Sequence, residues 1–332
     1  NSAHQFVRPL ELVGMTKDAC IEYASNSTGE FIFNDTQTYP QNRTKVRDLK
    51  FLRTGEMDAY NVMCVRILSS YCKFYNCVFQ NDTSSPIAFD QATDTTGTGI
   101  NIHGDRRHGC QVECVNTGTS CEVELHDCIG IGSPFGFKNT RGFYLWSGSP
   151  RLYGCTGIGG GIGERGYGIV AHRHSQAYLY DCVGIGSPYG YRLANGIQFQ
   201  ANTLTECYHC IGKGGTGYQY VSTGGRDNYV KQSTITGASH GFGFIMDVAP
   251  KLIDCIGYAG DGAGDGEESR ALYCLEQAHP IITGGYYGKE TLVKAFEWKK
   301  DSGQVYMSLP IGNDNRDCII TDVYFENTGN IL

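Results

Sequence analysis

A nearly identical stretch recurs at a fixed interval in the middle of this chain. Cys128, Cys155 and Cys182 are 27 residues apart, and Cys210 follows 28 residues later. The copies at Cys128 and Cys182 share the order Asp-Cys-(Ile/Val)-Gly-Ile-Gly-Ser-Pro. A period of this size is typical of stacked structural repeats, in which each unit packs only on its neighbours.

The residues between the cysteines have the chemistry of short strands. Each repeat carries further apolar runs, such as Gly142–Trp146 and Arg151–Tyr153, which are aromatic or β-branched and bounded by Gly, Pro, Asn or Ser. No window has the apolar spacing of a long amphipathic helix, and 45 glycines would make helices costly. Three short strands per repeat predict an all-β fold, a single-stranded right-handed parallel β-helix of roughly 25–28 residues per rung.

One continuous domain is expected for the 332 residues, because each rung packs on the next. About twelve rungs at about 4.8 Å each would give a stack of roughly 60 Å. Residues 1–45 are predicted to form irregular N-terminal coils and residues 46–332 the main β-helix. The 51 residues from Cys77 to Cys128 fit two short rungs or one rung with an excursion. Within them, residues 98–103 read as a strand and residues 104–109 as a charged loop.

Charge and cysteine content limit the partners. The net charge is −7 and no basic run is present, so no nucleic-acid partner is expected. No apolar stretch approaches the roughly 20 residues of a membrane span. The recurring cysteines are predicted to stack as a column of buried free thiols, which favours folding in a reducing compartment. The Cys207/Cys210 pair lacks a second pair with zinc-site spacing. The acidic segment 261–268 could hold calcium, although it lacks the ligand order of an EF-hand, and no other cofactor is expected.

The repeats resemble the right-handed parallel β-helix of the pectate-lyase-like superfamily. The opening segment Val7–Asp18 is similar to early coils of that superfamily, and the likeness extends over most of the chain. Its members include polysaccharide lyases, glycoside hydrolases, epimerases and bacteriophage tailspikes that bind or cut surface glycans. The likeness is one of fold, and it carries no catalytic motif that can be transferred residue by residue.

The Gly-x-Gly pair after each column cysteine imitates a dinucleotide-binding loop. Gly130 and Gly132 recur at the rung period and no helix follows them. They are interpreted as turn architecture rather than as a phosphate site.

The ends of the second apolar runs should form a stripe along the stack. Aromatic, imidazole, amide and carboxylate groups in one line suit a sugar chain, which needs stacking faces and hydrogen-bonding partners. The alternative is that these are ordinary solvated strand ends, with the tryptophan as packing. The predicted substrate-binding residues are His103, Arg106, Trp146, His172, Arg173, His174 and Gln200.

Two carboxylates at the ends of these apolar runs are the predicted catalytic pair. Asp247 and Glu276 are 29 residues apart, which places them on adjacent rungs. A separation of about 5 Å suits a retaining glycosidase, and a two-rung separation suits an inverting one. A lyase would instead need a base, with calcium or an arginine against a uronate carboxylate. Arg106, Arg107 and Arg173 are the candidates.

The sequence therefore favours a carbohydrate-binding β-helix, the body of a phage tailspike that binds or depolymerises a cell-surface polysaccharide. The free thiols fit a virion protein folded in the host cytoplasm, and the resemblance implies a homotrimer. One alternative is a secreted bacterial polysaccharide lyase or glycoside hydrolase acting as a monomer. Another is a non-catalytic adhesin or structural spike, so enzymatic activity stays open.

Overall fold

The computed structural model consists of strands and connecting turns throughout the part of the chain that it describes. Its three sheets are each built from ten strands, and every pairing between neighbours is parallel. The described residues are 4–6, 10–16, 18–24, 31–33, 44–55, 61–68, 72–83, 106–112, 123–134, 139–160, 165–172, 175–187, 194–200, 203–215, 241–245, 248–259, 272–275, 280–289, 296–298, 319–321 and 324–325.

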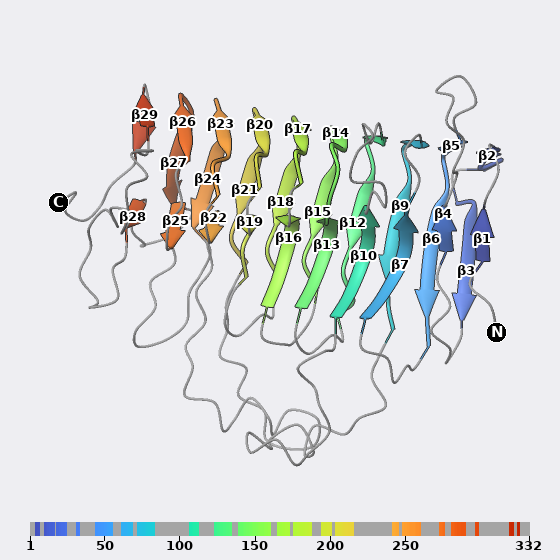
Figure 1. Ribbon diagram of the computed structural model, residues 1–332. Coiled ribbons are helices and arrows are strands. Elements are labelled where there is room, and N and C mark those ends of the chain that lie inside the picture. The colour runs from blue at the N-terminus through green and yellow to red at the C-terminus, as the bar shows by residue number, and fades with distance from the viewer. Residues whose placement is uncertain are drawn as a thin grey trace, which may run out of the picture.

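Each sheet takes every third strand of the chain, so one strand from each sheet makes a rung (Figure 1). Sheet A contains β1 (His4–Phe6), β4 (Phe31–Phe33), β7 (Asn61–Ile67), β10 (Arg106–Val112), β13 (Asn139–Leu145), β16 (Arg165–His172), β19 (Ile197–Gln200), β22 (Phe242–Ile245), β25 (Leu272–Leu275) and β28 (Phe296–Trp298). Sheet B contains β2 (Glu11–Val13), β5 (Thr44–Arg47), β8 (Cys72–Tyr75), β11 (Glu124–His126), β14 (Arg151–Tyr153), β17 (Tyr178–Tyr180), β20 (Glu206–Tyr208), β23 (Lys251–Ile253), β26 (Ile281–Thr283) and β29 (Ile319–Thr321). Sheet C contains β3 (Cys20–Ala24), β6 (Lys50–Thr54), β9 (Val78–Asn81), β12 (Ile129–Ile131), β15 (Thr156–Ile158), β18 (Val183–Ile185), β21 (Ile211–Lys213), β24 (Ile256–Ala259), β27 (Tyr286–Lys289) and β30 (Tyr324–Phe325).

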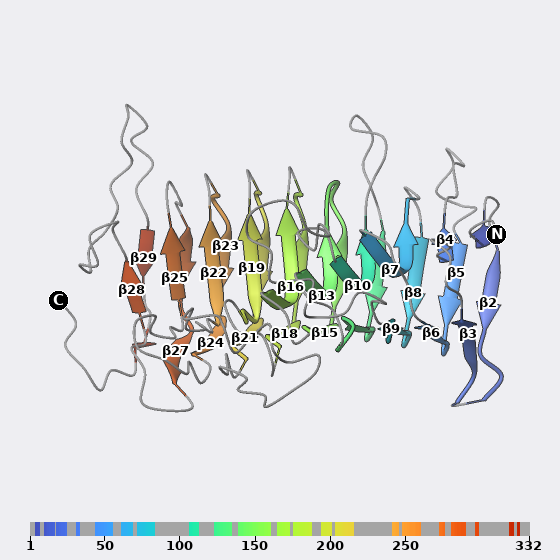
Figure 2. The same cartoon turned by 90° about the horizontal axis from the view of Figure 1, so that it is seen from below.

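This topology confirms the predicted parallel β-helix. Figures 1 and 2 show the strands as a row of rungs, with β2 and β3 at one end and β28 and β29 at the other. The described part of the chain forms ten rungs, and the expectation of twelve was wrong because several rungs are long. Lys73 of β8 pairs directly with Glu124 of β11, so the 51-residue interval is a single rung with an excursion.

The position predicted from the sequence for the strand in this long rung was wrong. β10 spans Arg106–Val112, so residues 106–109, expected in a charged loop, are extended and paired with β7 and β13. The pairing of Arg106 with both Asn61 and Asn139 fixes its place in sheet A. The expected strand at 98–103 lies outside the described residues. The regular spacing of 27–28 residues is lost in this rung, so the position of its strand could not be found by counting from the neighbouring repeats.

The core follows from strand alternation, in which successive side chains face opposite sides. The central residues of the sheet B strands from β11 to β26, such as Leu125 and Leu152, are fully buried. The first rungs are filled by phenylalanines, most of which meet edge to face, with Phe33 and Phe74 at 5.0 Å between centroids. All of these side chains belong to one continuous core that runs along the stack.

The middle rungs narrow to a contact between the backbones of sheets A and C. A Cβ atom added at Gly157 of β15 would lie 2.4 Å from the carbonyl oxygen of Gly168 in β16. One added at Gly130 of β12 would lie 2.6 Å from the oxygen of Gly142 in β13. The interpretation of Gly130 as a turn residue was therefore wrong. It lies inside a strand, where the absence of a side chain permits close approach of two sheets.

The recurring cysteines form the predicted column, one residue after each turn between sheets B and C. Cys128, Cys155 and Cys182 are buried and free. Each inserts between rungs, and the Cys155 thiol donates to the carbonyl of Leu125 on the preceding rung at 3.3 Å. The same bond joins Cys182 to Leu152 at 3.4 Å. The column thus couples neighbouring rungs through weak S–H donors as well as through the strand ladders.

Candidate functional site

The outer surface of sheet B carries two regular rows of side chains. Because the middle residue of each short strand faces the core, its first and third residues face outward. We name the third-position residues the ring row and the first-position residues the charged row. The ring row consists of Tyr75, His126, Tyr153, Tyr180 and Tyr208. The charged row consists of Lys73, Glu124, Arg151, Tyr178, Glu206 and Lys251.

The ring row is a continuous stack. Ring centroids are 4.8 Å apart between Tyr75 and His126 and 4.7 Å apart between His126 and Tyr153. Tyr153 and Tyr180, and then Tyr180 and Tyr208, follow at 5.0 Å with planes within 10° of parallel. The inner rings cover one another's faces, so the row presents ring edges and hydroxyls to solvent. Within the described residues, the hydroxyls of Tyr153 and Tyr180 make no hydrogen bond to protein.

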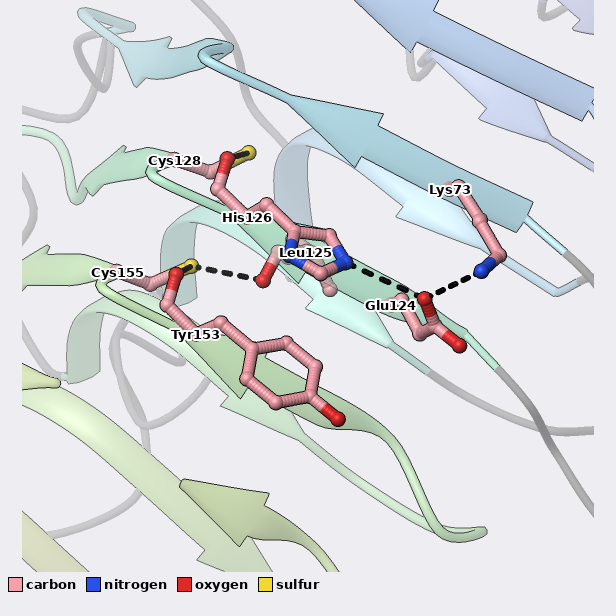
Figure 3. Close-up of polar contacts among 7 residues, drawn as sticks. All are labelled: Lys73, Glu124, Leu125, His126, Cys128, Tyr153 and Cys155. Carbon is pink, nitrogen blue, oxygen red and sulfur yellow. Dashed lines mark hydrogen bonds and ion pairs between the residues drawn. The ribbon is translucent and has the colours of Figure 1, made fainter. Parts of the chain in front are cut away.

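An ion pair lies at one end of the charged row. The Lys73 ammonium lies 2.6 Å from a carboxylate oxygen of Glu124, and Nε2 of His126 lies 3.2 Å from the same oxygen (Figure 3). Partial burial opposes ionisation of Glu124, but the bonds from Lys73 and His126 outweigh it and lower the pKa of this carboxyl.

The other end repeats this arrangement with a tyrosine. Lys251 donates to Glu206 at 2.8 Å, and the Tyr208 hydroxyl donates to the other carboxylate oxygen at 2.6 Å. These two bonds lower the pKa of Glu206. The same carboxylate raises the pKa of Tyr208 to about 12, since ionising the phenol would remove its bond and place two anions together.

These two glutamates do not form a glycosidase pair. Both are held ionised by their lysines, so neither is suited to donate a proton near neutral pH. Glu124 and Glu206 are also three rungs apart, or about 14 Å at the usual strand spacing. Glycosidase carboxyls are about 5–9.5 Å apart. The sheet B surface is therefore arranged for binding.

A row of turn residues borders this surface. Asp127, Asp181 and Asp254 have positive φ angles of 51°, 53° and 49°, and Asp127 and its equivalents are exposed. His209 and Gly154 occupy the same position on other rungs, with φ of 51° and 60°. The backbone N–H of each bonds to the next rung, as from Asp127 to the Tyr153 carbonyl at 2.8 Å, so the ladder continues through the turn.

The predicted stripe on sheet A is described in part. Trp146 follows β13, while His172 and Gln200 end β16 and β19 and pair in register. The Trp146 ring lies 5.0 Å from His172 and 5.2 Å from Tyr144, whose hydroxyl is 3.1 Å from Nδ1 of His172. Trp146 thus packs against two rings while remaining partly exposed. These three predicted residues are brought to neighbouring rungs.

The remaining predicted site residues cannot be placed in the same way. His103, Arg173, His174, Asp247 and Glu276 lie outside the described residues. The strands that directly precede the two carboxylates, β22 and β25, are neighbours in sheet A. Arg106 begins β10. The catalytic and substrate roles of these residues stay predictions.

The ring row was missed although its signal is present in the sequence. A tyrosine stands two residues before each of Cys77, Cys155, Cys182 and Cys210. This periodicity was interpreted as part of the strand that leads to the cysteine. Its outward direction becomes evident only when the central leucine of the strand is recognised as the core residue.

Among the described residues, no group of three or more His, Cys, Asp or Glu side chains is arranged to hold a metal ion. The segment 261–268, which could hold calcium, lies outside them. No helix in the described part of the chain is long and apolar enough to cross a membrane. A hollow of about 750 Å³ at the first rungs is lined by Gly14, Met15, Thr16, Asp18, Cys20, Asp48, Leu49, Lys50, Asn76 and Val78.

Comparison with known proteins gives a single distant likeness to report. No family model and no curated protein sequence matches the chain. The structure is similar to the crystal structure of bacteriophage CBA120 tailspike protein 3, with 12% identity and a TM-score of 0.34. The match covers 99% of this chain and 52% of that chain, so the chain spans about half its length. A likeness this distant assigns no family, and membership of the pectate-lyase-like superfamily stays a prediction.

Proposed function

We propose that this protein binds a cell-surface polysaccharide laid along the solenoid axis over the ring row and charged row of sheet B. The observation that carries the proposal is the repetition of polar ring edges at 4.7–5.0 Å along five consecutive rungs. A surface that repeats at a constant interval suits a ligand that is itself a chain of similar units. Tyrosines supply both an apolar body and a hydroxyl for such contacts.

The chemistry of the two rows favours a glycan over other linear polymers. The turn row beside them is acidic at Asp127, Asp181 and Asp254, and the whole chain carries a net charge of −7. Binding of nucleic acid requires many cationic side chains that neutralise phosphates, and this surface has few of them. Hydroxyl, carboxylate and ammonium groups at regular spacing match the donors and acceptors of sugar hydroxyls.

The test removes hydroxyls without disturbing the stack. A Tyr153→Phe/Tyr180→Phe double variant keeps both rings but loses two hydrogen-bonding groups, each worth about 0.5–1.5 kcal/mol. Binding to a panel of bacterial capsular and O-chain polysaccharides, measured by biolayer interferometry, is expected to weaken roughly fivefold to a hundredfold. Tyr258→Phe, on the outer side of sheet C, is the matched control and should leave affinity unchanged. Failure of every polysaccharide to bind the parent protein, or equal affinity of the double variant, would contradict the proposal.

Cleavage of the glycan is a separate part of the proposal, because its candidate residues follow strands of sheet A rather than sheet B. Asp247 and Glu276 are the proposed glycosidase pair, supported by the neighbouring positions of β22 and β25. Trp146, His172 and Gln200, at the ends of other sheet A strands, are the proposed sugar contacts. Incubation with a bound polysaccharide should release oligosaccharides with new reducing ends, and Asp247→Asn and Glu276→Gln should abolish release. An unsaturated product absorbing in the ultraviolet would indicate a lyase instead. Binding without release of oligosaccharides would favour the alternative of a non-catalytic adhesin.

Assembly as a homotrimer in a phage tail is the proposed biological setting. Free buried thiols at Cys128, Cys155 and Cys182 suit a protein folded in a reducing cytoplasm before virion assembly. Light scattering should give three times the mass of the chain. A monomer at micromolar concentration would favour the secreted bacterial enzyme.

A further inference from the structure

Arg151 differs from the other charged residues of its row because its neighbours are already occupied. Glu124 is its register partner on β11, yet the Glu124 carboxylate is engaged by Lys73 at 2.6 Å and by His126 at 3.2 Å. Glu206 is engaged by Lys251 at 2.8 Å. No carboxylate of a described residue lies within ion-pair distance of Arg151, which is exposed. A guanidinium displayed in this way is available to an external anion.

Tyr178 stands beside Arg151 and also differs from the other tyrosines of this surface. It pairs in register with Arg151 on one side and Glu206 on the other. Its row therefore contains no aromatic neighbour, and its ring stacks on no other described ring. Tyr153 and Tyr180, by contrast, cover each other at 5.0 Å. The Tyr178 side chain is partly exposed, and no described ring stacks on it.

The turn row supports the same location independently. From β11 to β23, every rung has a carboxylate in the charged row or at the turn, except the rung of β14. That rung carries Arg151, Tyr153 and Gly154, and the glycine occupies the position held by Asp127 and Asp181 on the two adjacent rungs. The rung with the available guanidinium thus supplies no carboxylate of its own to repel an anion, and the carboxylate beside Gly154 comes from Asp127 on the preceding rung.

We propose that β14 and β17 form an anion subsite that accepts a carboxylate- or sulfate-bearing sugar unit of the polysaccharide. Arg151 pairs with the anionic group through its planar fork of donors, which matches two oxygens at once. Tyr178 receives one face of the sugar ring, and the hydroxyls of Tyr153 and Tyr180 bond its polar groups. This inference rests on the proposed function, because it names the charge class of the glycan at the same surface.

The experiment uses three polymers that share one backbone: dextran, carboxymethyl-dextran and dextran sulfate. At low salt the two charged polymers should bind the full chain, and dextran should bind at least tenfold more weakly. Arg151→Gln should weaken binding of the charged polymers about tenfold, with Arg151→Lys in between. Lys45→Gln removes an exposed cation of the same sheet on β5 and should change affinity less than twofold. Carboxymethyl and sulfate arms show which anion the subsite prefers.

A second, isosteric pair tests the charge at the turn. Gly154→Asp should weaken binding of the charged polymers by at least threefold relative to Gly154→Asn, because the two differ by one charge near the subsite. The subsite is refuted if Arg151→Gln costs no more than Lys45→Gln, or if the charged polymers bind no better than dextran. If a neutral polysaccharide from the panel then binds through Tyr153 and Tyr180, the proposed function still stands. If no polysaccharide binds at all, both fail.

Discussion

The turn between sheets B and C depends on single residues that tolerate a left-handed backbone. Asp48, Asn76 and Asp127 have φ between 49° and 55°, where most side chains are strained. Asn and Asp are the side chains that enter this region most readily, apart from glycine itself. The Nδ2 of Asn76 also donates to the Asp48 carboxylate at 2.9 Å, which joins two rungs. The recurrence of Asp or Asn at this position is visible in the sequence, whereas the link between rungs is seen only in the structure.

Replacing the glycine of this row by asparagine should stabilise the protein. Gly154 has a φ of 60°, and an added side chain would meet the movable end of Asp127. Gly154→Asn should raise the free energy of unfolding by about 0.4–1 kcal/mol, by restricting the unfolded chain and allowing a bond like that of Asn76. Gly154→Ala is the control, and should cost roughly 1 kcal/mol because alanine resists this conformation. Urea unfolding midpoints measure both, and a stabilising alanine would contradict the explanation.

A methyl group at the contact between sheets A and C should be strongly destabilising. The Cβ of Gly157→Ala would lie 2.4 Å from the Gly168 carbonyl oxygen, so backbone atoms must move apart. We expect a loss of about 1–3 kcal/mol in the free energy of unfolding. Thr156→Ala, at the adjacent outward position, should change it by less than about 0.5 kcal/mol. Equal effects of the two substitutions in thermal unfolding would show that the sheets are not in contact there.

Strands of three residues are stable here because each is held on both sides by its counterparts. The unbroken repeat from Cys128 to Cys210 allowed these strands to be predicted, since each copy confirms the next. The prediction failed at β10, where Arg106 was expected in a loop, because a rung of 51 residues offers no neighbouring copy for comparison. The prediction that Gly130 is a turn residue failed for a different reason. The residues around Gly130 contain no sign that Gly142 approaches it from another sheet.

The link between β20 and β23 should make stability depend on pH. The bonds from Lys251 and Tyr208 lower the pKa of Glu206 below its unfolded value of about 4.3. The stabilisation is therefore fully present above about pH 4.3 and is lost as pH falls through the lower folded pKa. Glu206→Gln should lower the melting temperature at pH 7, by an amount equivalent to less than about 1 kcal/mol. The difference in melting temperature between this variant and the parent protein should disappear on acidification below pH 4.

The control for this prediction is Glu22→Gln. The carboxylate of Glu22 accepts a hydrogen bond from the Thr54 hydroxyl at 3.1 Å, which a neutral amide can also accept. At pH 7 its melting temperature should therefore stay close to that of the parent protein. A Glu206→Gln difference that stays constant between pH 7 and pH 3 would show that the ion pair with Lys251 does not contribute to folding.

At the scale of the whole molecule, the candidate site is a property of stacking. Arg151, Tyr178 and the ring row come from separate rungs, and no local motif joins them. The sequence could predict that equivalent positions align, as His172 and Gln200 do. It could not predict which of the three outer surfaces remains accessible. On sheet A the outward residues Tyr144 and Val170 are buried, whereas those of sheet B are not.

The thiol column offers a test of whether the central rungs unfold together. Cys128, Cys155 and Cys182 are fully buried, and burial raises the pKa of the Cys128 and Cys182 thiols well above the usual range. They should therefore resist alkylation in the native protein, whereas exposed Cys20 should react and serve as the internal positive control. In a urea series with brief iodoacetamide pulses and peptide mass spectrometry, all three should become reactive at one urea concentration.

The physical reason is the coupling between neighbouring rungs. Each rung has little core of its own, and the column bonds from Cys155 to Leu125 and from Cys182 to Leu152 close only when the preceding rung is in place. Loss of one rung therefore exposes the next. Separate midpoints for the three cysteines would mean that rungs unfold singly, and labelling of Cys155 in the native state would mean that sheets B and C do not enclose the column.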